Sequence, residues 1–429
     1  MKQSVFGKVP TEWGIISFDN DGLEIIDGDR GENYPKNDEL FTSGDCLFLN
    51  ARNFEHDEFC FDEAQFISKE KDNRLRKGKL VRGDFVLTTR GTVGSIAYYG
   101  EDVPFDHLRI NSGMVILRID PTFFDPVYFY QFLKSKCFKD QIIKFVSGTA
   151  QSQLPIRDMK QMSIIAPSLP EQKNIGRVLN ALDQKIRFLR NQNNLYKKMS
   201  QALFARWFFE YEFPDGKGNP YSSSRGKMVD SESGGIPEGW LVCKFGDILE
   251  RLSDRIGRDD QSKYIVLSAV KTGDLVLSEE YFSKQVFSKD ISKYIKLQKD
   301  DFAYNPARIN IGSIGKLEAD IQGAVSPVYV AFRAKDNFTH FVSFLIKTQK
   351  TRRHIDYFAN GSVRQSLSYD DFAFMDIVKP SEDVLKAFNE TYECIAKRIQ
   401  ANNQQIDTLS KMLDTLMPKL LTGEIRVKA

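Results

Sequence analysis

The sequence predicts an α+β protein: two similar mixed α/β modules separated by a long antiparallel two-helix coiled coil, with a pseudo-twofold internal repeat. Three observations predict this class: a long internal repeat, the same order of strands and helices in each copy, and a heptad seam after each copy. At 429 residues the chain is too long for one hydrophobic core and should divide into two or more domains.

The repeat is the most informative of these features. Residues 145–168 align with residues 358–381 without a gap, and 8 of the 24 positions are identical. A repeat of this length implies two copies of a whole domain rather than a solenoid of short units. Two similar modules in one chain suit a ligand that itself has two similar, rotated parts, and duplex DNA has this symmetry.

The first module is predicted over 1–168 and is rich in strands. The stretches 80–89 and 113–119 are apolar, β-branched and bounded by Gly, Asn and Pro, which is typical of strands. A helix is predicted over 126–145, with proline in its first turn where helices tolerate it. The polar stretch 147–154 follows as a loop.

The second module is predicted over 239–380 and repeats this order. Its expected elements are strands at 264–268 and 327–332, a helix at 338–358 and a polar loop at 360–367. A linker over 211–238, rich in Gly, Ser and Pro, is expected to return the chain to the start of this module.

A long helix is predicted after each module, over 169–210 and over 381–422. In both, apolar residues recur in a 4-3 alternation, which is the heptad seam of a coiled coil. An amphipathic helix packed alone on a globular core is the alternative, but it predicts a wider apolar stripe. Both seams keep one register at the spacing of the repeat, so the two helices are expected to pair. Asn193 and Asn402 lie in the seams, where a buried Asn helps to fix register at some cost in stability.

Helices of this length are stiff spacers. About 38 residues with a rise of roughly 1.5 Å each span about 57 Å. The expected architecture is therefore two mixed α/β heads held apart by a helical rod.

The sequence contains only fragments of catalytic motifs. Amino-methyltransferases carry an Asn/Asp/Ser-Pro-Pro-aromatic motif, which Asp125-Pro-Val-Tyr128 and Asn305-Pro-Ala-Arg308 match only in part. No Gly-x-Gly-x-x-Gly follows a strand and no Walker loop occurs, so the sequence gives no sign of S-adenosylmethionine or ATP binding. The one Pro-Asp pair lies in the linker, which argues against a nuclease of that motif. The chain is predicted to recognise a ligand and to catalyse nothing itself.

The cysteine spacing and the distribution of charge further limit the classes of function that fit the chain. The five cysteines form no Cys-x-x-Cys and the four histidines are scattered, so free thiols and no metal site are expected. The net charge is only +2, but 169–210 holds eight Lys and Arg against three Asp and Glu, and 345–365 holds five against one. Such stretches fit phosphate contact at chosen places, and a solvated helix face is the alternative. No long apolar run and no apolar leader occur, so a cytoplasmic location is expected.

Several segments resemble the specificity (S) subunits of type I restriction-modification systems. They are Ala202–Ser224, Gly235–Trp240, Leu169–Ile175, Gly91–Gly94 and the terminal Pro418–Ile425. The combination covers essentially the whole chain and is far more specific than any one piece. The chain departs from the family pattern at Arg225, where a Gly is usual, and at Ser381-Glu-Asp-Val384, where Leu-Pro-Glu-Gln usually opens the helix. The second module also has Ala307–Gly312 where the first has Arg90–Gly94, which fits two modules that read different sequences.

The resemblance implies a non-catalytic DNA-specificity subunit and scaffold. Each module would be a target recognition domain that reads one half of a bipartite site in double-stranded DNA. The paired helices would set the gap between the halves and bind two modification (M) subunits, which carry S-adenosylmethionine. Restriction (R) subunits, with ATP and Mg²⁺, would join the same assembly, and this chain would need no cofactor of its own.

The candidate DNA contacts follow from the chemistry that reads bases: Gln and Asn pair with adenine, and Arg pairs with guanine. The candidates in the loops of the first module are Arg90, Thr92, Ser147, Thr149, Gln151 and Gln153. Those in the second module are Asn305, Arg308, Asn310, Ser362, Arg364 and Gln365. The candidates for phosphate contact on the preceding helices are Lys134, Lys139, Lys350 and Arg352. The alternative is that these loops only cap helices and close turns.

Two other classes of function stay open at this point. A self-contained methyltransferase or nuclease would show turnover with S-adenosylmethionine, or with Mg²⁺ and DNA. A coiled-coil adaptor whose heads bind peptides would not lose its ligand with rising salt in step with counterion release.

Overall fold

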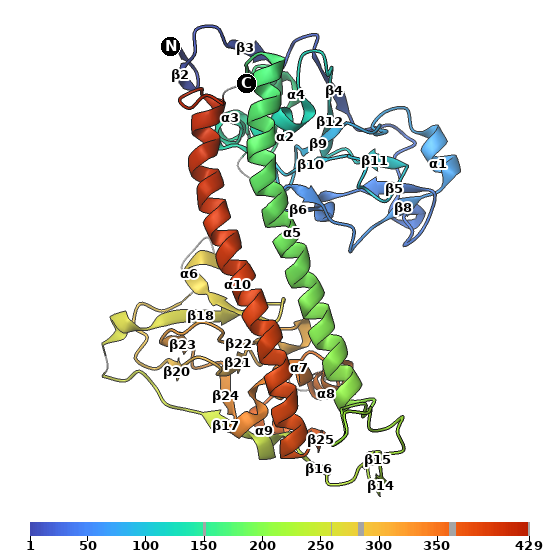
Figure 1. Ribbon diagram of the computed structural model, residues 1–429, viewed down its shortest axis with the longest axis vertical. Helices are drawn as coiled ribbons and strands as arrows, with labels where there is room; N and C mark the ends of the chain where they lie inside the picture. The colour runs from blue at the N-terminus through green and yellow to red at the C-terminus, as the bar shows by residue number, and fades with distance from the viewer. Residues whose placement is uncertain (149–151, 259, 282–286, 360–365, 428–429) are drawn as a thin grey trace. The chain divides into compact units, whose positions relative to one another are not determined.

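The computed structural model describes residues 1–148, 152–258, 260–281, 287–359 and 366–427 (Figure 1). The chain forms two compact units: unit 1 contains residues 1–191 and 402–429, and unit 2 contains residues 192–401. Two helices of 40 residues, α5 (Leu169–Phe208) and α10 (Glu382–Leu421), each contribute to both units. Within the described ranges, every helix is too short or too polar to cross a membrane.

Unit 1 is built on a four-stranded antiparallel sheet with the strand order β10-β9-β12-β4. A second sheet has the order β11-β5-β8, and β3 pairs with β13. The strands are β1 (Lys2–Ser4), β2 (Gly7–Val9), β3 (Gly14–Ser17), β4 (Leu23–Asp27), β5 (Cys46–Leu49), β6 (Phe54–Glu55), β7 (Glu58–Phe59), β8 (Phe66–Ile67), β9 (Phe85–Thr88), β10 (Ile96–Tyr98), β11 (Leu108–Ile110), β12 (Met114–Ile119) and β13 (Ser163–Ala166). The shorter helices are α1 (Lys69–Arg74), α2 (Pro126–Lys134), α3 (Lys136–Phe145) and α4 (Ile156–Met159), with 3-10 turns η1 (Asn37–Glu39) and η2 (Ala51–Asn53).

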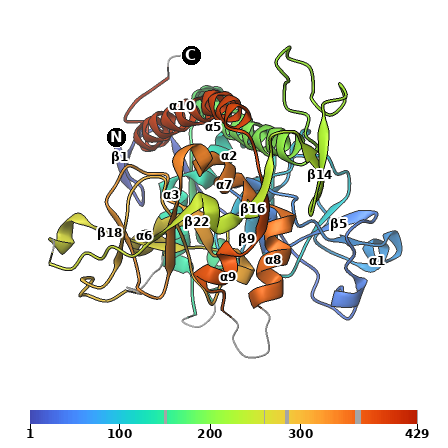
Figure 2. The same cartoon turned by 90° about the horizontal axis from the view of Figure 1, so that it is seen from below.

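Unit 2 repeats this plan with a four-stranded antiparallel sheet of order β17-β24-β21-β22. A second sheet has the order β19-β18-β23-β20, and β16 pairs with β25. The strands are β14 (Met228–Ser231), β15 (Gly234–Pro237), β16 (Leu241–Lys244), β17 (Leu249–Leu252), β18 (Ile265–Ala269), β19 (Leu275–Leu277), β20 (Ile295–Leu297), β21 (Phe302–Tyr304), β22 (Ile314–Lys316), β23 (Gly323–Val325), β24 (Val330–Ala334) and β25 (Asp376–Lys379). The shorter helices are α6 (Ser278–Tyr281), α7 (Thr339–Leu345), α8 (Gln349–Ala359) and α9 (Tyr369–Ala373), with 3-10 turns η3 (Phe245–Ile248), η4 (Gln261–Lys263), η5 (Ile309–Ile311) and η6 (Asp336–Phe338). Helices α8 and α9 lie side by side, and α9 contacts η3 (Figure 2).

The duplication extends over the whole module, although its spacing changes along the chain. Strand β25 is the counterpart of β13 in the repeat, and helix α10 is the counterpart of α5. Both counterparts keep the spacing that relates residue 145 to residue 358. The strands β3 and β16, near the start of each module, lie further apart along the chain than this. The two copies therefore differ in the lengths of their strand-connecting loops, and a comparison without gaps finds only the C-terminal part of the repeat.

Each helix predicted before the polar loop is two helices in the structure, so the prediction of one continuous helix is wrong in both modules. In the first module Ser135 is extended between α2 and α3; its hydroxyl donates to Phe132 O at 2.6 Å and accepts from Phe138 N at 3.3 Å. In the second module Thr348 makes the matching bonds to Leu345 O at 2.8 Å and from Thr351 N at 3.3 Å. A hydroxyl side chain thus ends one helix and caps the next at the same position of the repeat.

An arginine paired with a buried carboxylate occurs at the same place in each module. Arg118 of β12 forms two parallel bonds, of 2.8 and 2.9 Å, to the carboxylate of Asp84 just before β9. Arg333 of β24 bonds in the same way, at 2.6 and 3.0 Å, to Asp301 just before β21. Each carboxylate also accepts a backbone N–H of its own turn at 2.8 Å. Because both carboxylates are almost fully buried, they fix the strand register at this end of each sheet.

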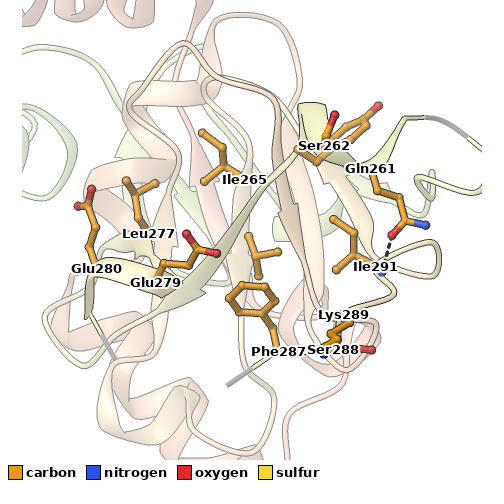
Figure 3. A pocket seen from close by; sticks show the side chains of 12 residues that line it. Gln261, Ser262, Ile265, Leu277, Glu279, Glu280, Phe287, Ser288, Lys289 and Ile291 are labelled. Atoms are coloured by element: carbon orange, nitrogen blue, oxygen red, sulfur yellow. Dashed lines mark hydrogen bonds between the residues drawn. The ribbon is translucent and has the colours of Figure 1, made fainter. Parts of the chain in front are cut away.

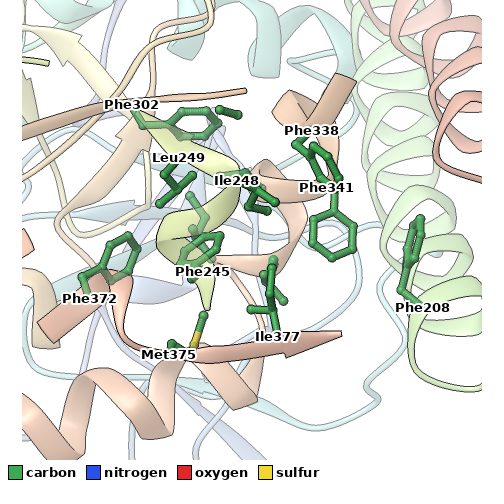
Figure 4. Close-up of a cluster of buried hydrophobic side chains, with 14 of the residues drawn as sticks. Phe208, Phe245, Ile248, Leu249, Phe302, Phe338, Phe341, Phe372, Met375 and Ile377 are labelled. Atoms are coloured by element: carbon green, nitrogen blue, oxygen red, sulfur yellow. The ribbon is translucent and has the colours of Figure 1, made fainter. Parts of the chain in front are cut away.

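The two long helices complete the core of both units. In unit 1, Ile175 and Leu179 of α5 share one buried cluster with Leu420 and Leu421 of α10. In unit 2, Phe204 and Phe208 of α5 share another cluster with Leu385 and Phe388 of α10, and Phe208 lies edge-on to Phe341 of α7 at 5.0 Å (Figure 4). The start of each helix therefore packs with the end of the other, so the expected antiparallel pair is confirmed.

The seam residues of both helices are buried or partly buried along their length, as the heptad pattern predicts. Asn193 and Asn402 are among them, with exposed fractions of 6% and 8%. The segment 211–238, predicted as a linker, has a defined structure. It contains the β14–β15 hairpin, and Phe213 stacks between Tyr221 and Trp240 at 4.6 and 5.1 Å.

We predict that Asp84→Ala lowers the free energy of unfolding by about 2–3 kcal/mol, because Arg118 and the N–H of Val81 lose a buried acceptor. Urea denaturation followed by tryptophan fluorescence measures the loss. Asp106→Ala is the control, since the Asp106 side chain is 89% exposed and pairs with Arg82 at the surface; we expect a change below about 0.5 kcal/mol. Equal losses in the two variants would contradict the structural role of the buried pair.

Candidate nucleic-acid interface

In the first module, one end of the main sheet collects the loops that carry the predicted reading residues. Strands β4 and β9 end there, and β10 and β12 begin there, because neighbouring strands are antiparallel. We call this the loop end of the sheet. The loops 28–31, 89–95 and 111–113 all lie at it.

Backbone hydrogen bonds bring the predicted residues of the first module together at this end. Arg90 and Ser147 each form a β-bridge with Gln153, and Ser147 and Gln153 exchange two backbone bonds of 2.9 Å. The N–H groups of Thr89 and Arg90 both bond to Gly113 O, at 2.7 and 3.2 Å. Three predicted residues from two distant loops therefore share one surface.

Of the three remaining predicted residues of this module, one lies in the described part of the chain and two lie outside it. Thr92 is exposed on the loop 89–95, and its carbonyl accepts the hydroxyl of Thr88, which ties the loop to the end of β9. Thr149 and Gln151 lie outside the described residues.

The second module has an equivalent loop end, where β17 and β21 finish and β22 and β24 begin. Here Asn305 organises the turn: its carbonyl accepts from Arg308 N at 2.9 Å, and its side chain accepts from Ala307 N at 3.1 Å. Gly312 is left-handed with φ of +91°, and a Cβ on it would lie 2.8 Å from Lys271 O, so glycine is required.

Around this turn the structure gathers some of the predicted residues of the second module. Arg308 is exposed, and Asn305 and Asn310 are partly exposed. Leu367 N bonds to Pro306 O at 3.1 Å, which joins this turn to the segment after α8. Ser362, Arg364 and Gln365 lie outside the described residues.

The predicted phosphate contacts divide into one buried lysine and three surface residues. The Lys134 side chain is 9% exposed, and its ammonium bonds to both carboxylate oxygens of Asp183 on α5, at 2.6 and 2.7 Å. Lys134 is therefore engaged within the fold, and we leave it out of the DNA surface. Lys139 pairs with Asp57 at 3.1 Å but is half exposed, Lys350 is exposed, and Arg352 is exposed beside Asp356 at 3.6 Å.

The Lys134–Asp183 pair belongs to a charged contact that holds the first module to α5. Gln131 of α2 also donates to Asp183, at 3.3 Å, and Arg187 of α5 lies 2.6 Å from Glu58 in the β6–β7 hairpin. Burial raises the pKa of the Glu58 carboxyl, and the nearby Arg187 charge acts in the opposite direction. These groups orient the sheet on the helix, and through it the loop end.

A hollow in unit 2 has the wrong charge for a nucleic acid. It encloses about 630 Å³ and has an apolar floor that includes Ile265 and Phe287 (Figure 3). Among the described residues that line it, Glu279 and Glu280 carry negative charge and Lys289 carries positive charge. These charges do not favour phosphate, so we do not include the hollow in the candidate interface.

The structure joins none of the five cysteines, all of which lie in the described part of the chain, in a disulfide. In the part of the chain that the structure describes, no three His, Cys, Asp or Glu side chains gather as metal ligands.

Sequence reasoning missed the residues that hold the reading loops in place. Asn111 accepts the N–H of Gly113 at 2.8 Å, and this turn supports Arg90. The Asn-Ser-Gly composition between two apolar runs is a recognisable turn signal. The pairing of Asp84 with Arg118 has no local signal, because the two residues are far apart in the sequence.

We predict that Lys134→Gln destabilises the protein by about 3 kcal/mol, because Asp183 keeps its charge in a buried site without its cationic partner. Thermal or urea unfolding of the full chain measures this loss. Lys139→Gln is the matched control, with an expected change below about 0.5 kcal/mol, since that side chain is 47% exposed. Equal stability of Lys134→Gln and the unmodified chain would return Lys134 to the candidate DNA contacts.

Comparison with known proteins gives one consistent result. Residues 23–197 match the type I restriction modification DNA specificity domain. The type I restriction enzyme MjaIX specificity subunit of Methanocaldococcus jannaschii is 24% identical over 447 aligned residues, which cover 100% of this chain and 96% of that protein. The putative MjaX specificity subunit of the same organism is 22% identical, covering 100% and 97% of the two chains.

The fold is also similar to that of a solved structure. The crystal structure of the type I restriction-modification S subunit from M. genitalium superposes with a TM-score of 0.52, covering 98% of both chains at 13% identity. The duplicated module, the two long helices and these matches agree over the full length of the chain. Residues 23–197 therefore match a type I restriction modification DNA specificity domain, and the whole chain is similar in sequence to type I restriction enzyme specificity subunits.

Proposed function

We propose that this chain is the DNA sequence-specificity subunit of a type I restriction-modification complex and catalyses no reaction itself. Its first module, residues 1–168, and its second, residues 239–380, each read one half of a bipartite site. The observation that carries the proposal is the repeated loop end. Each module presents exposed or partly exposed Arg and amide side chains at the equivalent end of its own main sheet.

The chemistry of these side chains suits base edges in the major groove. A guanidinium such as that of Arg90 or Arg308 bonds to O6 and N7 of guanine, and an amide such as that of Gln153 or Asn305 bonds to N6 and N7 of adenine. The backbone bonds that place Arg90 beside Gln153 leave both residues partly exposed. Because the residues differ between the modules, the two half-sites would differ in sequence.

The helices α5 and α10 suit the role of spacer. Each holds 40 residues, which corresponds to about 60 Å of helix. Half-sites on one face of B-DNA recur roughly every 34 Å, and a stiff pair of helices would set the number of unread base pairs between them.

The same helices would bind two M subunits, one at each half of the pair. Met199 of α5 and Met412 of α10 occupy the same position of the repeat and are 49% and 45% exposed, so each offers an apolar contact there. The M subunits would carry the methyl-transfer site and S-adenosylmethionine. R subunits, with ATP and Mg²⁺, would join this assembly.

We predict that Arg90→Gln alters recognition of one half-site only. Loss of a bidentate contact to guanine costs about 1–3 kcal/mol, or roughly a 5- to 150-fold loss of affinity, and relaxes the preference at that base pair. The measurement is a competition-binding assay with DNA libraries randomised in one half-site at a time.

The control is Lys160→Gln. Lys160 is half exposed and pairs with Asp19 near the start of β4, at the opposite end of the sheet. It should leave both half-site preferences unchanged. Retention of the original preference by Arg90→Gln would exclude Arg90 as a reading residue, and an unmodified chain without any sequence preference would refute the proposed function.

A further inference from the structure

A basic depression lies at the loop end of the first module, beyond the reading loops. It encloses about 380 Å³, and the loop after β4 and the chain around Arg76 line it. Gly28, at its base, is packed so closely that a Cβ would lie 2.4 Å from Asn111 O. Since the turn at Asn111 also supports Arg90, the depression and the reading loop share one frame.

Three exposed cations line this depression: Arg30, Arg76 and Lys77. Asp29 faces them, but its carboxylate is buried and accepts the N–H groups of Gly31 and Arg76, at 2.9 and 2.8 Å. These two bonds lower the pKa of Asp29, so the carboxylate holds the loop in its charged form. Asp27, 3.0 Å from Arg30, and the charged Asp29 offset two of the three positive charges, which leaves a net charge of +1.

The second module carries exposed arginines at the same place. An Asp-Arg pair stands two and three residues after the end of β4, as Asp29 and Arg30, and at the same distance after β17, as Asp254 and Arg255. There the loop is tied to a neighbouring segment by Ile256 N to Tyr294 O at 3.0 Å. Arg255 and Arg258 are both exposed. The sequence 253–260 also contains three Asp, so the feature common to the two modules is the placement of exposed arginines and not a net positive charge.

We infer that these two loops are phosphate clamps, which grip the DNA backbone outside the bases that each module reads. The inference rests on the proposed function and names a further part of the same interface. Strands β9, β12 and β4 are neighbours, so the ends of β9 and β4 lie about 10 Å apart. That distance equals about three base pairs of rise in B-DNA. A sheet whose edge runs along the duplex axis would place the clamp on phosphates about three base pairs away from the bases beside Arg90.

A clamp of this kind adds affinity and orientation without sequence information. The test uses the full chain with Arg30, Arg76 and Lys77 replaced by Gln, and a second variant with Arg255→Gln and Arg258→Gln. Binding is measured on specific and scrambled DNA by fluorescence anisotropy across a salt series. A chain with Lys8→Gln and Lys160→Gln is the control, because both lysines are at the surface and neither lines the depression.

The expected result is a weaker affinity on both DNAs by the same factor, with the ratio between them unchanged. The slope of log K against log salt should fall by about one unit for each phosphate that a variant no longer binds. Neutral methylphosphonate linkages about three base pairs outside the read bases should weaken binding by the unmodified chain and have no further effect on the clamp variants.

Unchanged affinity and slope in both clamp variants would overturn the inference. A loss of affinity confined to specific DNA would also overturn it, because the loops would then read bases. Failure of the proposed function gives a different result: an unmodified chain that binds specific and scrambled DNA equally, whatever the clamp variants do.

Discussion

The packing of both long helices into each module is the constraint on which the rest of the structure depends. In unit 1, Ile175 of α5 and Leu421 of α10 belong to one buried cluster, and in unit 2, Phe204 and Phe388 belong to another. Neither core is complete with one helix, so each module fixes the two helices antiparallel to each other. The sheet of the first module is in turn oriented by α5, through the contact of Lys134 with Asp183. The loop end of that sheet therefore has a defined direction relative to the helix.

The duplicated modules keep the elements that position the loops and vary the loops themselves. The hydroxyl caps at Ser135 and Thr348 and the buried pairs of Asp84 and Asp301 occupy equivalent places and make equivalent bonds. At the loop end, by contrast, a turn with Arg90 stands in one module and a 3-10 turn beside Arg308 in the other. The supporting contacts are therefore the same in both modules, and the exposed loop residues differ. This combination suits a chain that recognises two half-sites of different sequence with two modules of the same fold.

The sequence predicted the parts of the fold that rest on local or periodic signals. The heptad seams placed both long helices within two residues of their observed ends, since a seam depends only on spacing along the chain. The helix breaks at Ser135 and Thr348 were missed because a single capping hydroxyl gives a weak signal inside an apolar run. Three of the predicted reading residues, Arg90, Ser147 and Gln153, are brought together by the structure. The burial of Lys134 could not be predicted, because its partner Asp183 is distant in the sequence and only the tertiary structure joins them.

The most direct test of the spacer role is the gap between half-sites after the helices are lengthened. Four residues inserted near Asn193 in α5, with four at the matching level of α10, add about 6 Å. Methylation mapping of DNA modified by the chain with its M subunits would read the gap. A gap longer by one or two base pairs, with both half-sites unchanged, is the predicted result. An unchanged gap with full binding would contradict the idea that the paired helices set the distance between two DNA-reading modules.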